Sequence, residues 1–119
     1  MQYALLFYNQ PHTEIPEPER ESVMAGMLAE MRTWHVELDR AGVFRSMLRL
    51  APVDAATSLR KQGGEVLVTD GPFAETKEIL GGLAILECAD PAEALAWAKR
   101  CPLARIGTVE VRPEWGPAR

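Results

Sequence analysis

A long amphipathic stripe in the first half of the chain constrains the fold more than any other feature. From Glu19 to Ala41, apolar side chains recur every three or four residues, at Val23, Met27, Met31, Trp34, Leu38 and Ala41. This spacing is typical of a helix that buries one face. Pro18 suits the first helical turn and Gly42 suits the C-terminal cap. The stripe therefore predicts a helix that must pack against another layer.

Shorter apolar runs on both sides of this helix predict strands. A second helix is expected to begin at Asp90, with Asp90 as N-cap, Pro91 in the first turn and Glu93 completing a capping box, and to run to about Arg100 before Pro102. The expected strands are Tyr3–Tyr8, Val43–Leu50, Thr57–Lys61, Glu65–Thr69, Leu83–Cys88 and Thr108–Arg112, of which the third and fourth form a hairpin around Gly63 and Gly64.

The resulting order, β-α-β-hairpin-β-α-β, is the ferredoxin-like α+β pattern with an inserted β-hairpin. Both helices must then cover one face of an antiparallel sheet, and the other face stays bare. A bare apolar face costs about 25 cal/mol for each Å² of apolar area left in water. A second copy of the chain would cover it, so we expect a two-fold homodimer.

The overall composition narrows the functional classes. A chain of 119 residues predicts a single domain over residues 1–119. The net charge of −4 argues against nucleic-acid binding, and no apolar run is long enough for a membrane helix. The first residues lack the basic start of a signal peptide, and Cys88 and Cys101 lack disulfide or metal spacing. We therefore expect a cytoplasmic protein with two reduced, mostly buried thiols, without a metal or another cofactor.

The segment from Asp70 to Glu78 is the strongest candidate for a functional site. Gly71 and Pro72 predict a rigid turn directly after an apolar strand, and this turn delivers a cluster of ionisable side chains to one place. One interpretation is a structural turn with a solvated, charged exit. The other is a ligand or proton-transfer site on a rigid scaffold.

On the second interpretation, the candidate catalytic residues of the segment are Asp70, Glu75 and Glu78. Glu75 and Glu78 are three residues apart, so a helical turn there would place both on one side. Two crowded carboxylates would raise one pKa and create an acid/base pair. The candidate ligand-binding residues are Tyr8 at the end of the first strand, Phe73 and Lys77 within the segment, and the glycine pair Gly81 and Gly82 that follows it.

His35 is the remaining catalytic candidate, because histidine is the commonest general base near neutral pH. It lies at the flank of the apolar stripe of the first helix. It either packs its ring at the boundary of the core or moves protons toward a carboxylate across a cleft. His12, in a proline-rich loop, is expected to be exposed.

Four stretches of the sequence resemble the DGPF branch of the YCII-related protein family. They are MQYALLFY at the start, AGV after the first helix, VTDGPFAETKEILGG around the turn, and WAKRCP followed by GTVEVRP near the end. The resemblance implies a small ferredoxin-like or dimeric α+β-barrel domain. It implies little about chemistry, because most of that branch is uncharacterised. It also implies a sigma factor or another protein as partner, since related proteins are encoded beside extracytoplasmic-function sigma factors.

The wider family is associated with a histidine in the first helix and an aspartate before a proline after the second helix. This chain departs from that pattern. Its residue before Pro102 is Cys101, and the position that matches the histidine falls near Met31 rather than at His35. A histidine–aspartate pair is therefore not carried over to this chain.

Two functional hypotheses follow. The first is a homodimeric module that binds a metabolite or a protein partner, because the sequence shows no complete nucleophile–base or metal constellation. The second is a cofactor-free enzyme of the proton-transfer, lyase or hydrolase type that uses the carboxylates of the segment from Asp70 to Glu78.

Overall fold

The structure is a computed structural model that describes residues 1–9 and 16–116. The elements, in chain order, are β1 (Gln2–Asn9), α1 (Glu17–Arg40), β2 (Phe44–Arg49), the short 3₁₀ turn η2 (Val53–Ala55), β3 (Thr57–Gln62), β4 (Glu65–Asp70), β5 (Ile79–Glu87), α2 (Pro91–Lys99), the 3₁₀ turn η3 (Pro102–Arg105) and β6 (Gly107–Pro113).

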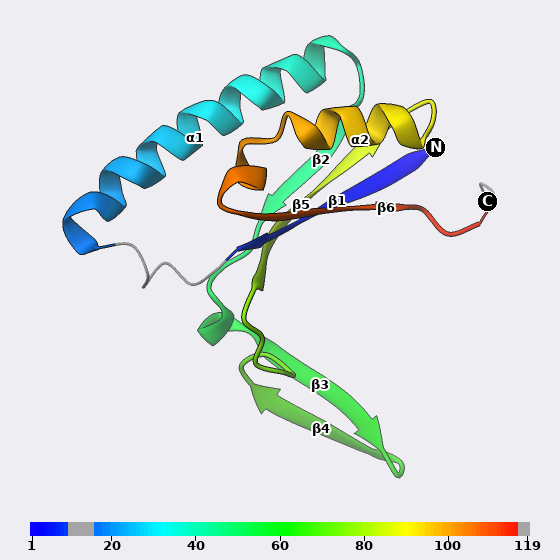
Figure 1. Cartoon of the computed structure of the whole chain (residues 1–119). Helices are drawn as coiled ribbons and strands as arrows, with labels where there is room; N and C mark the ends of the chain where they lie inside the picture. Colours follow the sequence, from blue (N-terminus) through cyan, green and yellow to red (C-terminus); the bar gives the residue numbers. More distant parts are fainter. Residues whose placement is uncertain (10–15, 117–119) are drawn as a thin grey trace.

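The main sheet has four strands in the order β2-β5-β1-β6, and every neighbouring pair is antiparallel. Helices α1 and α2 lie together on one face of this sheet (Figure 1). This arrangement confirms the predicted ferredoxin-like α+β fold. The predicted hairpin is also present, as a separate two-stranded sheet of β3 and β4.

The core lies between the sheet and the two helices. On the central strand β1, the side chains of Tyr3, Leu5 and Phe7 point toward the helices and are buried. Trp34 and Leu38 of α1 meet them, together with small residues of α2. The Trp34 ring lies edge-on to Phe7, and its Nε1 donates a hydrogen bond to the carbonyl of Trp97, at 3.1 Å. This bond ties the two helices to each other.

Only the C-terminal half of α1 covers the core. The predicted stripe is buried at Trp34 and Leu38 and half-buried at Met27 and Met31, but Val23 remains 41% exposed and Ala41 is exposed as well. The reason is length: the 24-residue helix extends about 36 Å, whereas an eight-residue strand such as β1 extends about 27 Å. The first turns of α1 therefore overhang the sheet (Figure 1).

The expected ends of the helices agree with the structure. Gly42 follows α1 with a φ of 74°, a conformation that favours glycine. At the start of α2, the Glu93 N–H donates to Oδ1 of Asp90, and Oε1 of Glu93 accepts from the N–H of Ala89, both at 2.8 Å. Asp90 thus caps α2 as predicted, whereas the Glu93 side chain accepts from the residue before the N-cap instead of from Asp90 itself.

The sheet face opposite the helices, called the open face below, carries no helix. Residues that pair directly across neighbouring strands lie on the same face, so the strand register defines its rows. One row contains Leu48, Leu83, Leu6 and Glu110, and the next contains Ser46, Ile85, Ala4 and Arg112. Leu48 is exposed, and the other apolar side chains of these rows are only half-buried.

Candidate functional site

The turn after β4 is fastened to the start of β3. Gly71 has a φ of 94°, and its N–H donates to the carbonyl of Ala56 at 2.7 Å. The Ser58 hydroxyl donates to the carbonyl of Gly71 at 2.8 Å. The predicted rigid turn is therefore present, and its position is set by backbone contacts at the base of the hairpin.

The acidic cluster does not converge within the described chain. Asp70 pairs with Thr57 at the end of the hairpin, and Glu75 and Lys77 are exposed, as is Phe73 with 83% of its surface accessible. Residues 71–78 form bends instead of the helical turn that would have placed Glu75 and Glu78 on one side. Of these carboxylates, only Glu78 lies at the edge of the main sheet.

A polar cluster marks the end of the open face. Oε1 and Oε2 of Glu78 accept from the hydroxyl of Thr108 on β6, at 3.3 and 3.1 Å. Thr108 pairs with Tyr8 across the strands, and the Tyr8 hydroxyl donates to Oε1 of Glu110 at 3.1 Å. We call Tyr8, Glu78, Thr108 and Glu110 the Tyr8 cluster. It unites two of the sequence-derived candidates, Tyr8 and Glu78, with two residues that the sequence did not single out.

The environment of Tyr8 favours its neutral form. Partial burial, followed by the hydrogen bond and the negative charge of Glu110, raises the pKa of Tyr8 above its ordinary value of 10.0. The phenol therefore remains a hydrogen-bond donor at neutral pH. A ligand on the open face would meet a neutral hydroxyl that is hydrogen-bonded to the Glu110 carboxylate.

The glycine pair lies inside β5, which begins four residues before the predicted Leu83. A Cβ at position 82 would lie 2.8 Å from the carbonyl oxygen of Leu48, and one at position 81 would lie 3.1 Å from Oδ1 of Asn9. Both distances are shorter than ordinary contacts. Gly81 and Gly82 thus allow the close approach of neighbouring strand and side-chain atoms of the same chain.

His35 lies apart from the Tyr8 cluster. Its ring stacks on Phe44 of β2, with centroids 4.1 Å apart, and its Nε2 is 3.4 Å from Oδ2 of Asp39 on the same helix. The structure describes no contact between His35 and Tyr8 or Glu78. The ring packs at the boundary of the core, as the first of the two alternatives for His35 expects. His12 lies outside the described residues.

A concavity lies between α1 and the turn after α2, and none of the site residues predicted from the sequence lines it. It encloses about 570 Å³ and is bridged by the ion pairs Arg100–Glu37 and Arg105–Glu30. Cys101 is buried at its base, and burial raises the pKa of this thiol from 9.0 to about 11. The thiol is therefore protonated at neutral pH and is not an activated nucleophile.

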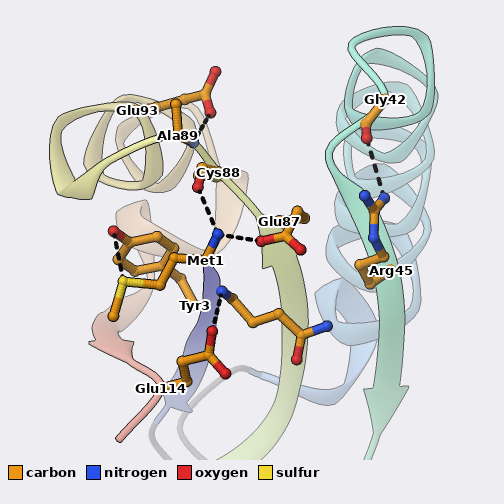
Figure 2. A network of polar contacts seen from close by, with 10 residues as sticks. Met1, Tyr3, Gly42, Arg45, Glu87, Cys88, Ala89, Glu93 and Glu114 are labelled. Carbon is orange, nitrogen blue, oxygen red and sulfur yellow. Dashed lines mark hydrogen bonds and ion pairs between the residues drawn. The ribbon is translucent and has the colours of Figure 1, made fainter. Parts of the chain in front are cut away.

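Another polar network lies at the end of the sheet where β1 begins (Figure 2). The Met1 amino group lies 2.5 Å from Oε2 of Glu87 and 3.3 Å from the carbonyl of Cys88. The Gln2 N–H donates to Oε1 of Glu114 at 2.9 Å. The hydrogen bond to Glu87 raises the pKa of the Met1 amino group and lowers that of the Glu87 carboxyl. These contacts join the ends of β1, β5 and β6.

Among the residues that the structure describes, no group of three or more histidine, cysteine and acidic side chains is arranged to hold a metal ion. Neither helix in the described ranges combines the length and the apolar character that crossing a bilayer requires. Cys88 and Cys101 are both buried and free, as expected.

Comparison with known protein families matches residues 1–115 to the YCII-related domain. The chain belongs to the YCII-related family. A similar protein from Rhizobium meliloti (strain 1021), described as uncharacterised, is 42% identical over 117 residues, which cover 95% of this chain and 91% of the relative. The YCII-related membership agrees with the ferredoxin-like fold, and it names no reaction for the Tyr8 cluster.

Proposed function

We propose that this YCII-related protein is a homodimeric binding module of the DGPF branch, acting in the cytoplasm, in which the open faces of two subunits meet around a small-molecule ligand. The observation that carries the proposal is the open face itself. Leu6 and Leu83 lie side by side in its central row, Leu48 continues the row to the edge, and no described helix covers them. A second open face would remove this apolar area from water.

The Tyr8 cluster would supply the polar groups at one end of the proposed ligand site. Binding sites for small molecules combine apolar walls with a few placed polar groups. Here the apolar rows end at the Tyr8 hydroxyl and the Glu78 and Glu110 carboxylates. This arrangement fits a ligand with an apolar body and a cationic or hydrogen-bond-donating group.

Two measurements test this proposal. Leu83→Asp places a charge in the centre of the open face and should convert the dimer into monomers, whereas Leu95→Asp, on the exposed side of α2, should not. A thermal-shift screen should find small molecules that stabilise the wild type and stabilise Tyr8→Phe less, because ligand binding stabilises the native state. Equal dimerisation of the two aspartate variants would refute the shared open face.

A protein partner is the alternative ligand for the same module. The exposed Phe73 and the exposed Trp115 are anchors of the kind that protein interfaces use. An extracytoplasmic-function sigma factor is the partner that the family resemblance suggests. Capture of a purified sigma factor by the wild type, and its loss in Phe73→Ala, would support this partner.

A cofactor-free enzyme of the proton-transfer, lyase or hydrolase type is the second candidate function. Glu78 favours it, because this carboxylate lies at the border of the open face beside Thr108 and opposite the end of β1. The double variant Glu75→Gln and Glu78→Gln should abolish turnover of a substrate found by screening. Unchanged turnover in a folded double variant would exclude the acidic segment as catalyst.

A further inference from the structure

The hairpin of β3 and β4, called the arm below (residues 57–70), has two unlike sides. The register pairs Leu59 with Val68 and Lys61 with Val66, so Leu59, Val66 and Val68 lie on one side. The other side carries Arg60 opposite Leu67, and Gln62 opposite Glu65. The first side, called the apolar side below, also carries Lys61, and Thr57 and Asp70 at its base, but its three apolar side chains are neighbours, whereas the other side has Leu67 alone among polar residues.

No part of the described chain covers the apolar side. Leu59 and Val68 are 63% and 61% exposed, and every residue of β4 is exposed. The arm is held to the rest of the protein at its base, by the contacts of Gly71 with Ala56 and Ser58. An isolated two-stranded hairpin is at best marginally stable in water, so the arm needs a surface to pack on.

The dimensions of the chain also indicate that the arm projects from the rest of the protein. Its radius of gyration is 16.6 Å, and its principal extents are 49 × 47 × 18 Å. A compact chain of this length has a radius of gyration of about 13–14 Å. The chain is therefore flat and extended, because the arm and the overhanging start of α1 project from the layered core.

The arm projects on the side of the sheet where a second copy of the chain would lie. Figure 1 shows the arm leaving the sheet on the side away from both helices, which is the side of the open face. Six residues of strand extend about 20 Å, whereas two stacked sheets lie about 10 Å apart. An arm of this length is long enough to pass the sheet of a subunit seated on the open face and to contact that subunit's helical layer.

We propose that the arm is a clasp between subunits, whose apolar side, formed by Leu59, Val66 and Val68, packs against the second copy of this chain. This inference rests on the proposed homodimer and adds to it a second contact, outside the open face. Each subunit of the two-fold dimer contributes one arm and receives one arm.

The neighbours Val68 and Leu67 provide a matched pair of variants. Val68→Asp puts a charge on the apolar side of the arm, and Leu67→Asp puts the same charge on the opposite side of the same strand. Sedimentation equilibrium should show that Val68→Asp weakens the dimer about a hundredfold, whereas Leu67→Asp changes its dissociation constant less than about threefold. Equal dissociation constants for the wild type and Val68→Asp would overturn the clasp and leave the open-face dimer standing. Equal weakening by both variants would also overturn it.

Hydrogen exchange of the wild type decides the question if Val68→Asp does not fold. The amides of β3 and β4 should be protected at concentrations where the protein is dimeric and should exchange rapidly after dilution to monomers. Protection that does not change with concentration would overturn the clasp. A wild type that is monomeric at micromolar concentration would overturn both the clasp and the proposed homodimer.

Discussion

The hydroxyl of Tyr8 lies 3.1 Å from Oε1 of Glu110, and this hydrogen bond crosses from β1 to β6 on the open face. The two residues are 102 positions apart in the sequence. The antiparallel pairing of the first and last strands brings them together. The pair lies at the edge of the apolar rows of the open face of this YCII-related protein.

Glu110 should control the ionisation of Tyr8. After partial burial, the hydrogen bond and the charge of Glu110 are the next causes of the raised pKa of Tyr8. Glu110→Gln removes the charge, so the pKa of Tyr8 should fall toward 10.0, as followed by NMR of ring-labelled tyrosine. Tyr3 serves as the internal control, because Glu110 does not contribute to its raised pKa. An unchanged titration of Tyr8 would contradict this account.

The two buried thiols should make stability depend on alkaline pH. Burial raises the pKa of Cys88 and of Cys101 from 9.0 to about 11. The unfolded chain therefore loses these protons at lower pH than the native protein, so their contribution to stability is full below pH 9 and is lost as the pH rises toward about 11. Urea unfolding across this range should show the decline. A thiol reagent should label both cysteines at least about a hundredfold more slowly in the native than in the unfolded protein; rapid native labelling would disprove their burial.

Gly107 should not tolerate a side chain. A Cβ at this position would lie 2.0 Å from the carbonyl oxygen of Tyr8, so the pairing of β6 with β1 would have to shift. Gly107→Ala should lower the free energy of unfolding by about 2–4 kcal/mol in urea denaturation. Gly26→Ala is the control: no atom lies within 4 Å of a Cβ there, and alanine in the helix should stabilise by about 0.5–1 kcal/mol. Equal effects of the two substitutions would contradict the close approach.

Asp90 should stabilise α2 through its cap. Asp90→Ala removes the acceptor for the N–H of Glu93 and should cost about 1 kcal/mol of unfolding free energy. Asparagine can accept the same hydrogen bond, so Asp90→Asn should cost a few tenths of a kcal/mol at most. A loss of similar size in both variants would assign the effect to the charge of Asp90 rather than to its hydrogen bond.

Local patterns in the sequence predicted the fold well. The period of the apolar residues located α1, the capping residues Asp90 and Glu93 located α2, and the glycines Gly63 and Gly64 located the hairpin. Each of these patterns lies within or next to the element that it predicts, so a single sequence is enough to recognise it. The start of β5 was missed, because glycine is unfavourable in strands in general and Gly82 is needed here for the close approach of the Leu48 carbonyl.

The site was less predictable, because its contacts join distant strands. The rigid turn at Gly71 was anticipated, but the sequence does not reveal that Glu78 lies beside Thr108 or that Tyr8 bonds to Glu110. These pairs depend on strand order and register, which a local pattern does not contain. Likewise, the stripe of α1 predicted a buried face but not how far the helix overhangs the sheet.

Sedimentation equilibrium of the wild-type protein at micromolar concentration tests the central claim, that the open face is covered by a second copy of the chain. The wild-type protein should sediment as a single species with twice the mass of the 13.2 kDa chain. A folded protein that stays at the mass of one chain would contradict it.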